Sequence, residues 1–329
     1  MKIAVLGAPG FGGSNVCVEL LNRGHQVTGI SRSPEKLGKH DRYNPKPLDL
    51  QNASIAKLVE AFKGFDVIVN AYNPPSGPDL YSKFTHTLMS PNERTIAERY
   101  PESFLETVRK ILIAVKSSKP QPYFIVIGGT GSLELGRSQP YETVADSREF
   151  WLAYRRAVAD SEAATAHMEE RIGGGPMAEG MRKYRNARIA LHAGKASDAD
   201  RQAIKEAEEP VVSGPNPLPD LPLAARASFL MFEGNESFRW SFVSPSGQYR
   251  PGPRTGKYEV IRDTVPLAPE SAGDSKSENQ YEGRLLGISA ADLGVAIADE
   301  AEKQEKVGWH WSAFADLPSD EAMSSYARI

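Results

Sequence analysis

The sequence has only one cysteine, Cys17, in 329 residues, so the chain can form no internal disulfide bond. It also has no apolar run of membrane-spanning length and no long basic block, and its net charge is only −3. These absences argue against a transmembrane protein and against a nucleic-acid-binding surface. Because an apolar run already begins at residue 2, we expect no secretory signal and a cytoplasmic protein that binds neither membrane nor nucleic acid.

The sequence also lacks the spacings that hold a metal ion. It contains no His-Glu-x-x-His and no pair of cysteines, and its six histidines are scattered along the chain. We therefore expect no metal. Cys17 falls within a predicted helix, where a small buried hydrophobic side chain is expected rather than a reactive thiol.

The first thirty residues carry the most informative pattern. An apolar run at residues 2–6 leads into a glycine-rich turn at residues 7–13, then a helical stretch at residues 14–23 and a second apolar run at residues 25–30. Strand, glycine turn, helix and strand, in that order, are typical of a dinucleotide-binding unit. Glycine turns also join strands to helices in folds where they bind nothing.

Three glycines of this turn have separate expected roles. Gly7 permits the sharp exit from the strand, Gly10 lets the backbone approach a pyrophosphate, and Gly13 allows close packing of the helix on the strand. The free amides at the start of the helix would face the anion.

The end of the second apolar run indicates which dinucleotide is bound. NAD-binding proteins place a carboxylate there, about 20 residues after the last glycine. This chain has Arg32, 19 residues after Gly13, between Ser31 and Ser33. A guanidinium can bind a 2′-phosphate bidentately, so we expect NADP(H) as the cofactor, with the two serines as extra donors. A solvated loop arginine is the alternative.

The rest of the chain alternates between short apolar runs and helical patterns. Strands are predicted at residues 46–50, 66–70, 123–127 and 239–243, and helices at residues 53–62, 92–116 and 148–171. A further apolar segment lies at residues 223–232. Such alternation is typical of a parallel sheet. We therefore predict an α/β fold with a Rossmann-type doubly wound parallel sheet, helices on both faces and a smaller C-terminal substrate-binding part.

The predicted core is interrupted once. Residues 1–170 are expected to form the NAD(P)-binding core, and residues 223–329 its remainder with the substrate-binding part. Residues 171–222 form a predicted insertion whose polar body has helix formers but a weak apolar stripe. It is expected to pack over the rim as a lid, to stay partly mobile, or to be a surface extension without function. Near the C-terminus, Ser289 is expected to cap a helix, with Asp292 helping to complete the cap.

The chain resembles the atypical short-chain dehydrogenase/reductase group, specifically the NmrA-like NAD(P)H-binding proteins. Four segments carry the resemblance, in this order: GAPGFGG, LLNRGHQVTGISRS, IGGTGSL and FVSPSGQYRPGPRTGKY. The resemblance covers residues 1–170 and 223–315. The first segment is shared across the whole superfamily, whereas the last is more specific to this subgroup.

The resemblance implies a cofactor site built from the turns that follow the strands. The implied contact to the adenosine phosphate is Arg32, and Asp49 and Leu50 are implied to flank the adenine. The implied contacts to the pyrophosphate are Gly7, Pro9, Gly10, Phe11, Gly12 and Gly13. The implied contacts around the nicotinamide are Asn70, Ala71 and Tyr72 on its ribose, Gly129, Thr130 and Ser132 after the fifth strand, and Pro245, Ser246 and Tyr249 on its closing side.

One departure from the group concerns the proton donor. Conventional members carry a tyrosine followed four positions later by a lysine, and no tyrosine in this chain has that lysine. The candidate catalytic residues are therefore Ser132, Tyr154 and Tyr249, with water as a further proton source. Tyr154 has Arg155 and Arg156 beside it, which could lower its pKa. A tyrosine on a helix surface without function is the alternative.

Three functions follow from these observations. The first is an NADP(H)-dependent reductase of specialised metabolism that acts on a bulky, mostly apolar carbonyl, imine or conjugated alkene. The second is a non-redox cyclase or isomerase that keeps NADP(H) as a fixture. The third is an NmrA-like nucleotide-sensing regulator that binds a partner protein. The expected partner is a bulky small molecule, and the chain could be a monomer or a dimer.

Overall fold

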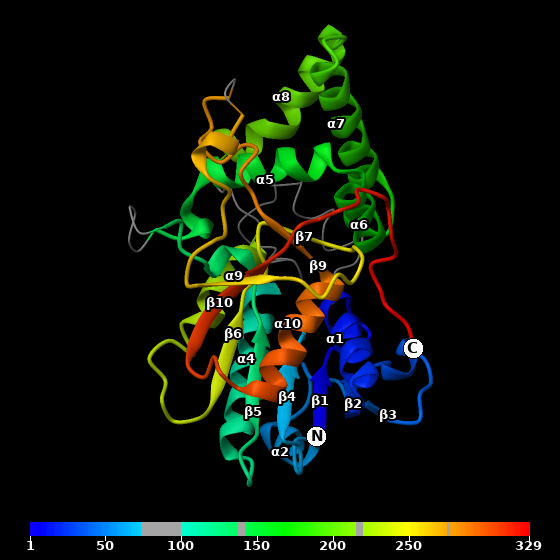
Figure 1. The fold of residues 1–329 in the computed structure, drawn as a ribbon, viewed down its shortest axis with the longest axis vertical. Helices are drawn as coiled ribbons and strands as arrows, with labels where there is room; N and C mark the ends of the chain where they lie inside the picture. The colour runs from blue at the N-terminus through cyan, green and yellow to red at the C-terminus, as the bar shows by residue number, and fades with distance from the viewer. Residues whose placement is uncertain (74–99, 137–141, 215–219, 275–276) are drawn as a thin grey trace, which may run out of the picture.

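The computed structural model describes residues 1–73, 100–136, 142–214, 220–274 and 277–329, and its centre is an eight-stranded sheet (Figure 1). The strand order is β3-β2-β1-β4-β5-β6-β10-β8, and β8 is antiparallel to β10 while the other described pairs are parallel. The strands are β1 Lys2–Leu6, β2 Gln26–Ser31, β3 Tyr43–Pro47, β4 Val67–Asn70, β5 Tyr123–Ile127, β6 Trp240–Val243, β8 Glu259–Arg262 and β10 Trp309–Phe314. A small second sheet pairs β7 Gln248–Arg250 with β9 Gly287–Ser289.

Helices cover both faces of the large sheet. In β1, Ile3 and Val5 belong to one buried apolar cluster, whereas Ala4 and Leu6 belong to the other. Two apolar faces on one strand require cover on both sides, as in parallel sheets generally. The helices that supply it are α1 Phe11–Asn22 and α10 Ala290–Lys303 on one face, and α2 Ile55–Ala61, α4 Tyr100–Ser117 and α9 Asp220–Phe229 on the other. The predicted fold class is thus confirmed.

Four further helices lie beyond the carboxyl ends of the strands, at the end of the molecule opposite the N-terminus (Figure 1). They are α5 Arg148–Asp160, α6 Glu162–Ile172, α7 Pro176–His192 and α8 Asp198–Val212. Helices α7 and α8 pack against each other and against α5. The division of the chain at residues 170 and 222, and the role of the segment between them, remain predictions.

Buried ion pairs fasten α7 and α8 to α5. The Arg188 side chain is only 4% exposed and lies 2.7 Å from Asp160. Glu208 of α8 accepts hydrogen bonds from Arg156 at 2.7 Å and from the Tyr184 hydroxyl at 2.8 Å. Breaking a buried pair leaves an uncompensated charge, so these contacts stabilise the packing of α5, α7 and α8.

Two predicted elements were placed wrongly. The third strand occupies Tyr43–Pro47, not residues 46–50, because Leu48 and Leu50 are buried in the core after the strand ends. The predicted helix 148–171 is interrupted at Ser161, whose hydroxyl accepts a hydrogen bond from the Ala164 amide as the N-cap of α6. Asp320 also accepts a hydrogen bond from the Glu162 amide at 2.8 Å, so a distant segment stabilises the new helix start.

Other predictions can be compared directly. Ser289 caps α10 as expected, but Asp292 does not complete the cap, because its carboxylate accepts hydrogen bonds from the Thr255 and Gly256 amides, each at 2.8 Å. Cys17 is fully buried, as predicted. The start predicted for the helix at residues 92–116 lies outside the described residues. In the described part of the chain, no helix is both long and apolar enough to span a bilayer.

Candidate cofactor site

The site begins at the turn that joins β1 to α1. Gly7 has a φ of +75°, and a Cβ atom there would lie 2.7 Å from the Ala71 carbonyl oxygen. A Cβ atom on Gly13 would lie 2.3 Å from the Gly7 carbonyl oxygen. Both approaches are closer than a side chain tolerates, so the turn requires glycine at these two positions.

The N-terminus of α1 has no cap of its own. Gly10 is the N-cap residue and has no side chain to bond the first amides, and the first turn contains no acidic residue. Uncapped amides and the helix dipole favour an anion at this position. The turn of residues 7–13 therefore has the electrostatics of a phosphate site.

Tyr249 of β7 reaches back to this turn. Its hydroxyl oxygen lies 3.2 Å from where a Cβ atom of Gly12 would be, and its ring packs 4.7 Å from the ring of Phe11. Burial raises the pKa of Tyr249, so the hydroxyl keeps its proton at neutral pH. Tyr249 therefore presents a hydrogen-bond donor beside the uncapped helix.

Several predicted site residues carry hydroxyl groups that are buried and have no hydrogen-bond partner in the described part of the chain, among them Ser31, Ser246 and Tyr249. A buried polar group without a partner costs about 1–3 kcal/mol of stability. A bound molecule with polar atoms would supply the missing partners. The residues present therefore fit a dinucleotide.

The opposite end of the site follows β2 and β3. Arg32 is exposed, and its charge acts on Asp49 and Tyr72. Burial alone would raise the pKa of Asp49, but hydrogen bonds from Asn52 and Gln51 together with the Arg32 charge lower it below its usual value. Ser33 precedes the 3-10 turn η1 Pro34–Leu37. A cation and a carboxylate thus lie side by side where the adenosine end is expected.

Two of the predicted residues near the adenosine and ribose have mainly internal contacts. The Leu50 side chain is buried in the core. Asn70 is buried at the end of β4, and its side-chain oxygen accepts a hydrogen bond from the Tyr72 amide at 3.2 Å. The Ala71 amide donates to the Leu6 carbonyl, which ties the end of β4 to β1.

The turn after β5 is tied to the segment after β6. It is the 3-10 turn η2 Thr130–Ser132, with Gly129 as its N-cap. The Thr130 hydroxyl donates to the Pro245 carbonyl oxygen at 2.9 Å. Ser132 is fully buried, and its hydroxyl contacts the Gly129 carbonyl and the Ser244 hydroxyl rather than the surface.

A family comparison supports this geometry. Residues 7–171 match the model of a family described as NAD(P)H-binding. The chain belongs to the NAD(P)H-binding family. The resemblance to atypical short-chain dehydrogenases/reductases is thereby confirmed, and the β1–α1 turn is the part of the chain at which the match begins.

This NAD(P)H-binding chain is similar to other proteins over more than nine-tenths of its length. It is 23% identical to the uncharacterized protein YwnB of Bacillus subtilis over 306 residues, which cover 93% of this chain and 94% of YwnB. A candidate epimerase from Bacteroides thetaiotaomicron has a similar structure, with a TM-score of 0.56, 22% identity, and coverage of 95% of this chain and 96% of that one. The oxidoreductase ylbE from Lactococcus lactis has a TM-score of 0.51 and 12% identity, over 97% and 93% of the two chains.

Tyr154 lies apart from the NAD(P)H-binding turn. It is on α5, where its ring packs edge-on against Trp151 with the centroids 5.2 Å apart. Arg155 lies over the ring of Tyr184, and Arg156 pairs with Glu208 and Glu282. The two arginine charges expected to lower the pKa of Tyr154 are thus directed toward other groups. A catalytic role for Tyr154 remains a prediction.

Sequence reasoning missed two polar residues beneath the site, Ser244 and His310. The Ser244 hydroxyl lies 2.9 Å from Nε2 of His310. Ser244 stands next to Pro245 in the segment FVSPSGQYRPGPRTGKY, which carries part of the family resemblance. His310 carried no signal, because it lies within the apolar strand β10.

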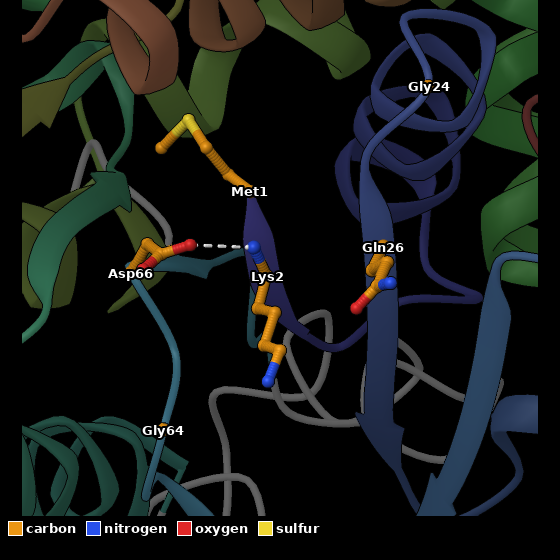
Figure 2. A pocket seen from close by; sticks show the side chains of 6 residues that line it. All are labelled: Met1, Lys2, Gly24, Gln26, Gly64 and Asp66. Atoms are coloured by element: carbon orange, nitrogen blue, oxygen red, sulfur yellow. Dashed lines mark hydrogen bonds between the residues drawn. The ribbon is translucent and has the colours of Figure 1, made fainter.

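A shallow pocket at the other edge of the sheet is separate from this site (Figure 2). The Lys2 amide donates there to the Asp66 carboxylate at 2.7 Å. Its lining residues come from the amino ends of β1 and β2 and from the start of β4: Met1, Lys2, Gly24, Gln26, Gly64 and Asp66. In doubly wound sheets ligands bind at the carboxyl ends, so this pocket takes no part in the NAD(P)H-binding site.

Proposed function

We propose that the protein is an NADP(H)-dependent oxidoreductase that reduces a bulky, mostly apolar carbonyl, imine or conjugated alkene. The observation that carries the proposal is the uncapped start of α1 beside the Tyr249 hydroxyl, which is buried against Gly12 and has no hydrogen-bond partner among the described residues. An anion site next to a buried donor suits the phosphates of a dinucleotide and the reacting end of its nicotinamide half.

The preference for NADP(H) rests on Arg32. Its exposed guanidinium follows β2, where a 2′-phosphate would lie, with Ser31 and Ser33 on either side. A charged hydrogen bond to such a phosphate contributes roughly 1.5–3 kcal/mol.

The protein's own residues would bind the cofactor and donate a hydrogen bond to the substrate. When bound, the reduced nicotinamide supplies a hydride. Residues 7–13 hold the pyrophosphate, and Gly129, Thr130 and Ser246 line the nicotinamide side. The Tyr249 hydroxyl stays protonated and donates a hydrogen bond to the substrate atom on which negative charge develops.

The test starts with absorbance and mass spectrometry of the purified protein for bound nucleotide. Fluorescence titration with NADPH and NADH follows, and then a turnover assay at 340 nm with aromatic aldehydes, quinones, cyclic imines and enones. Tight NADPH binding with substrate-dependent oxidation supports the proposal. Failure to bind either nucleotide would overturn it.

A non-redox cyclase or isomerase is the second candidate. It is favoured by one observation, the absence from the sequence of any tyrosine followed four positions later by a lysine, the pair that protonates a carbonyl in conventional members. A structural neighbour is also described as a candidate epimerase. Product formation at equal rates with oxidised and reduced cofactor, without net NADPH consumption, would favour this candidate.

A further inference from the structure

Three polar side chains meet in the core beneath the η2 turn. The Ser132 and Ser244 hydroxyl oxygens lie 2.7 Å apart, and Nε2 of His310 lies 2.9 Å from Ser244 and 3.3 Å from Ser132. Both serines are fully buried, and His310 is 4% exposed. We call these three residues the buried polar cluster. Replacing such a cluster with apolar groups is often neutral or stabilising, so stability alone gives little reason for it.

The surroundings of His310 make it a hydrogen-bond acceptor in this cluster. Its ring stacks on Phe229 with the centroids 4.1 Å apart, and Nδ1 lies 3.8 Å from the Asp263 carboxylate. Burial, assisted by the Arg226 charge, lowers the pKa of His310 to about 3, so the imidazole is neutral at pH 7. The carboxylate on the Nδ1 side favours a proton on that nitrogen, which leaves Nε2 to accept from the Ser244 hydroxyl at 2.9 Å. The Ser132 hydroxyl donates to the Gly129 carbonyl oxygen at 2.8 Å.

The cluster joins two segments at the carboxyl edge of the sheet. Ser132 ends the η2 turn, and Ser244 begins the segment that leads through Pro245 to Ser246. On the other side of the same junction, the Thr130 hydroxyl donates to the Pro245 carbonyl. The junction is therefore held from below by the buried polar cluster and from above by Thr130.

The junction lies on the nicotinamide side of the site. A dinucleotide crosses the carboxyl edge of a doubly wound sheet at the point where the strand order reverses, here between β1 and β4. Arg32 places the adenosine end beyond β2, so the nicotinamide half extends over β4, β5 and β6.

We propose that His310 is a positioning residue that, through Ser244 and Ser132, holds the η2 turn and the Ser244–Ser246 segment as the wall against which the nicotinamide half of the cofactor lies. This proposal rests on the proposed function. Hydrogen-bonded networks in a core favour one arrangement of the groups they join, and removing the His310 acceptor leaves the Ser244 hydroxyl free to reorient.

The experiment compares a whole dinucleotide with its adenosine half. The variants are His310→Phe, which keeps an aromatic ring on Phe229 but no acceptor, His310→Gln, which keeps an acceptor, and Ser244→Ala. Ser241→Ala is the matched control, because Ser241 is a fully buried serine of β6 whose hydroxyl accepts from Trp311 instead. Each protein is titrated with NADPH and with 2′,5′-ADP, and its thermal unfolding is measured. If the wild-type protein prefers NADH, the two ligands titrated are NADH and ADP.

We expect the variants to lose affinity for NADPH but not for 2′,5′-ADP. The Kd for NADPH rises about tenfold in His310→Phe and Ser244→Ala, while the Kd for 2′,5′-ADP is unchanged. His310→Gln recovers part of the loss, and Ser241→Ala binds both ligands normally. Equal losses for both ligands, or no loss for either, would overturn the proposal while the proposed function stands. If the wild-type protein binds neither NADPH nor NADH, nor their adenosine fragments, both the proposed function and this inference are wrong. If His310→Phe does not fold, Ser244→Ala decides.

Discussion

Arg32 and Tyr249 lie at opposite ends of the proposed cofactor site and are held in different ways. Arg32 is exposed on the segment after β2, and its charge acts on the Asp49 carboxylate. Tyr249 is packed against Phe11, and its hydroxyl has no partner in the described part of the chain. Each residue can therefore be tested by removing one group.

Arg32→Ala should weaken NADPH binding by roughly 10- to 100-fold and change NADH binding little, because the proposed partner of the guanidinium is the 2′-phosphate, which NADH lacks. Fluorescence titration with both nucleotides measures the effect. Lys36→Ala, at an exposed cation of η1, is the charge-matched control and should leave both affinities near wild type. Equal losses of NADPH and NADH in Arg32→Ala would contradict the assignment.

Tyr249→Phe should separate stability from catalysis. It removes a buried hydroxyl that has no partner in the described structure, so thermal stability should stay the same or rise slightly. The turnover number measured at 340 nm should fall, because the substrate loses a hydrogen-bond donor beside the atom on which negative charge develops. A lower melting temperature together with unchanged turnover would show that Tyr249 is only a packing residue.

At the scale of elements, α1 and its turn depend on close backbone approach. The Gly13 position is the tightest of this turn, with a hypothetical Cβ atom 2.3 Å from the Gly7 carbonyl oxygen. The helix α7 contains a glycine that, unlike Gly13, has space for a side chain. Gly180 lies within the helix, and a Cβ atom there would have no described atom within 4 Å apart from its chain neighbours and the backbone of its own helix.

Gly13→Ala and Gly180→Ala should therefore change stability in opposite directions. The first forces the turn apart and should lower the free energy of unfolding by about 1–3 kcal/mol. The second should raise it by about 0.5–1 kcal/mol, since alanine is the better helix former. Urea unfolding of both variants gives the comparison. A neutral Gly13→Ala would mean that the β1–α1 turn adjusts more easily than its geometry implies.

The scale of elements also shows where sequence reasoning stopped. The β1–α1 unit was predicted closely because its periodicity and glycines are local. The break at Ser161 was missed because part of the cap comes from Asp320, which is 158 residues from the Glu162 amide that it accepts from. The third strand was displaced because Leu48 and Leu50 look like strand residues, although they pack into the core after β3 has ended.

At the scale of the whole molecule, two buried histidines make stability depend on pH. Burial lowers the pKa of His167 and of His310 to about 3, with help from the charges of Arg171 and Arg226 respectively. In the unfolded chain both titrate near 6.5. Between these values the unfolded state binds more protons, so stability is present above about pH 6.5 and is lost as pH falls.

Lowering the pH from about 7 to about 5 should reduce the free energy of unfolding by about 2 kcal/mol for each histidine. Urea unfolding at several pH values measures this slope. His310→Phe should remove about half of it, because only His167 then remains. A variant with the full wild-type slope would mean that His310 is already protonated in the folded protein.

The sequence by itself determined the β1–α1 turn, the alternating sheet and the position of Arg32, because each depends on local periodicity or on spacing from a glycine. Only the tertiary structure decided how the side chains meet. It turned Ser132 inward, toward Ser244 and His310, which are 112 and 178 residues away. It also brought the Tyr249 hydroxyl to Gly12 and directed Arg156 toward α8. Contacts at such separations depend on how strands and helices pack, and no local pattern encodes them.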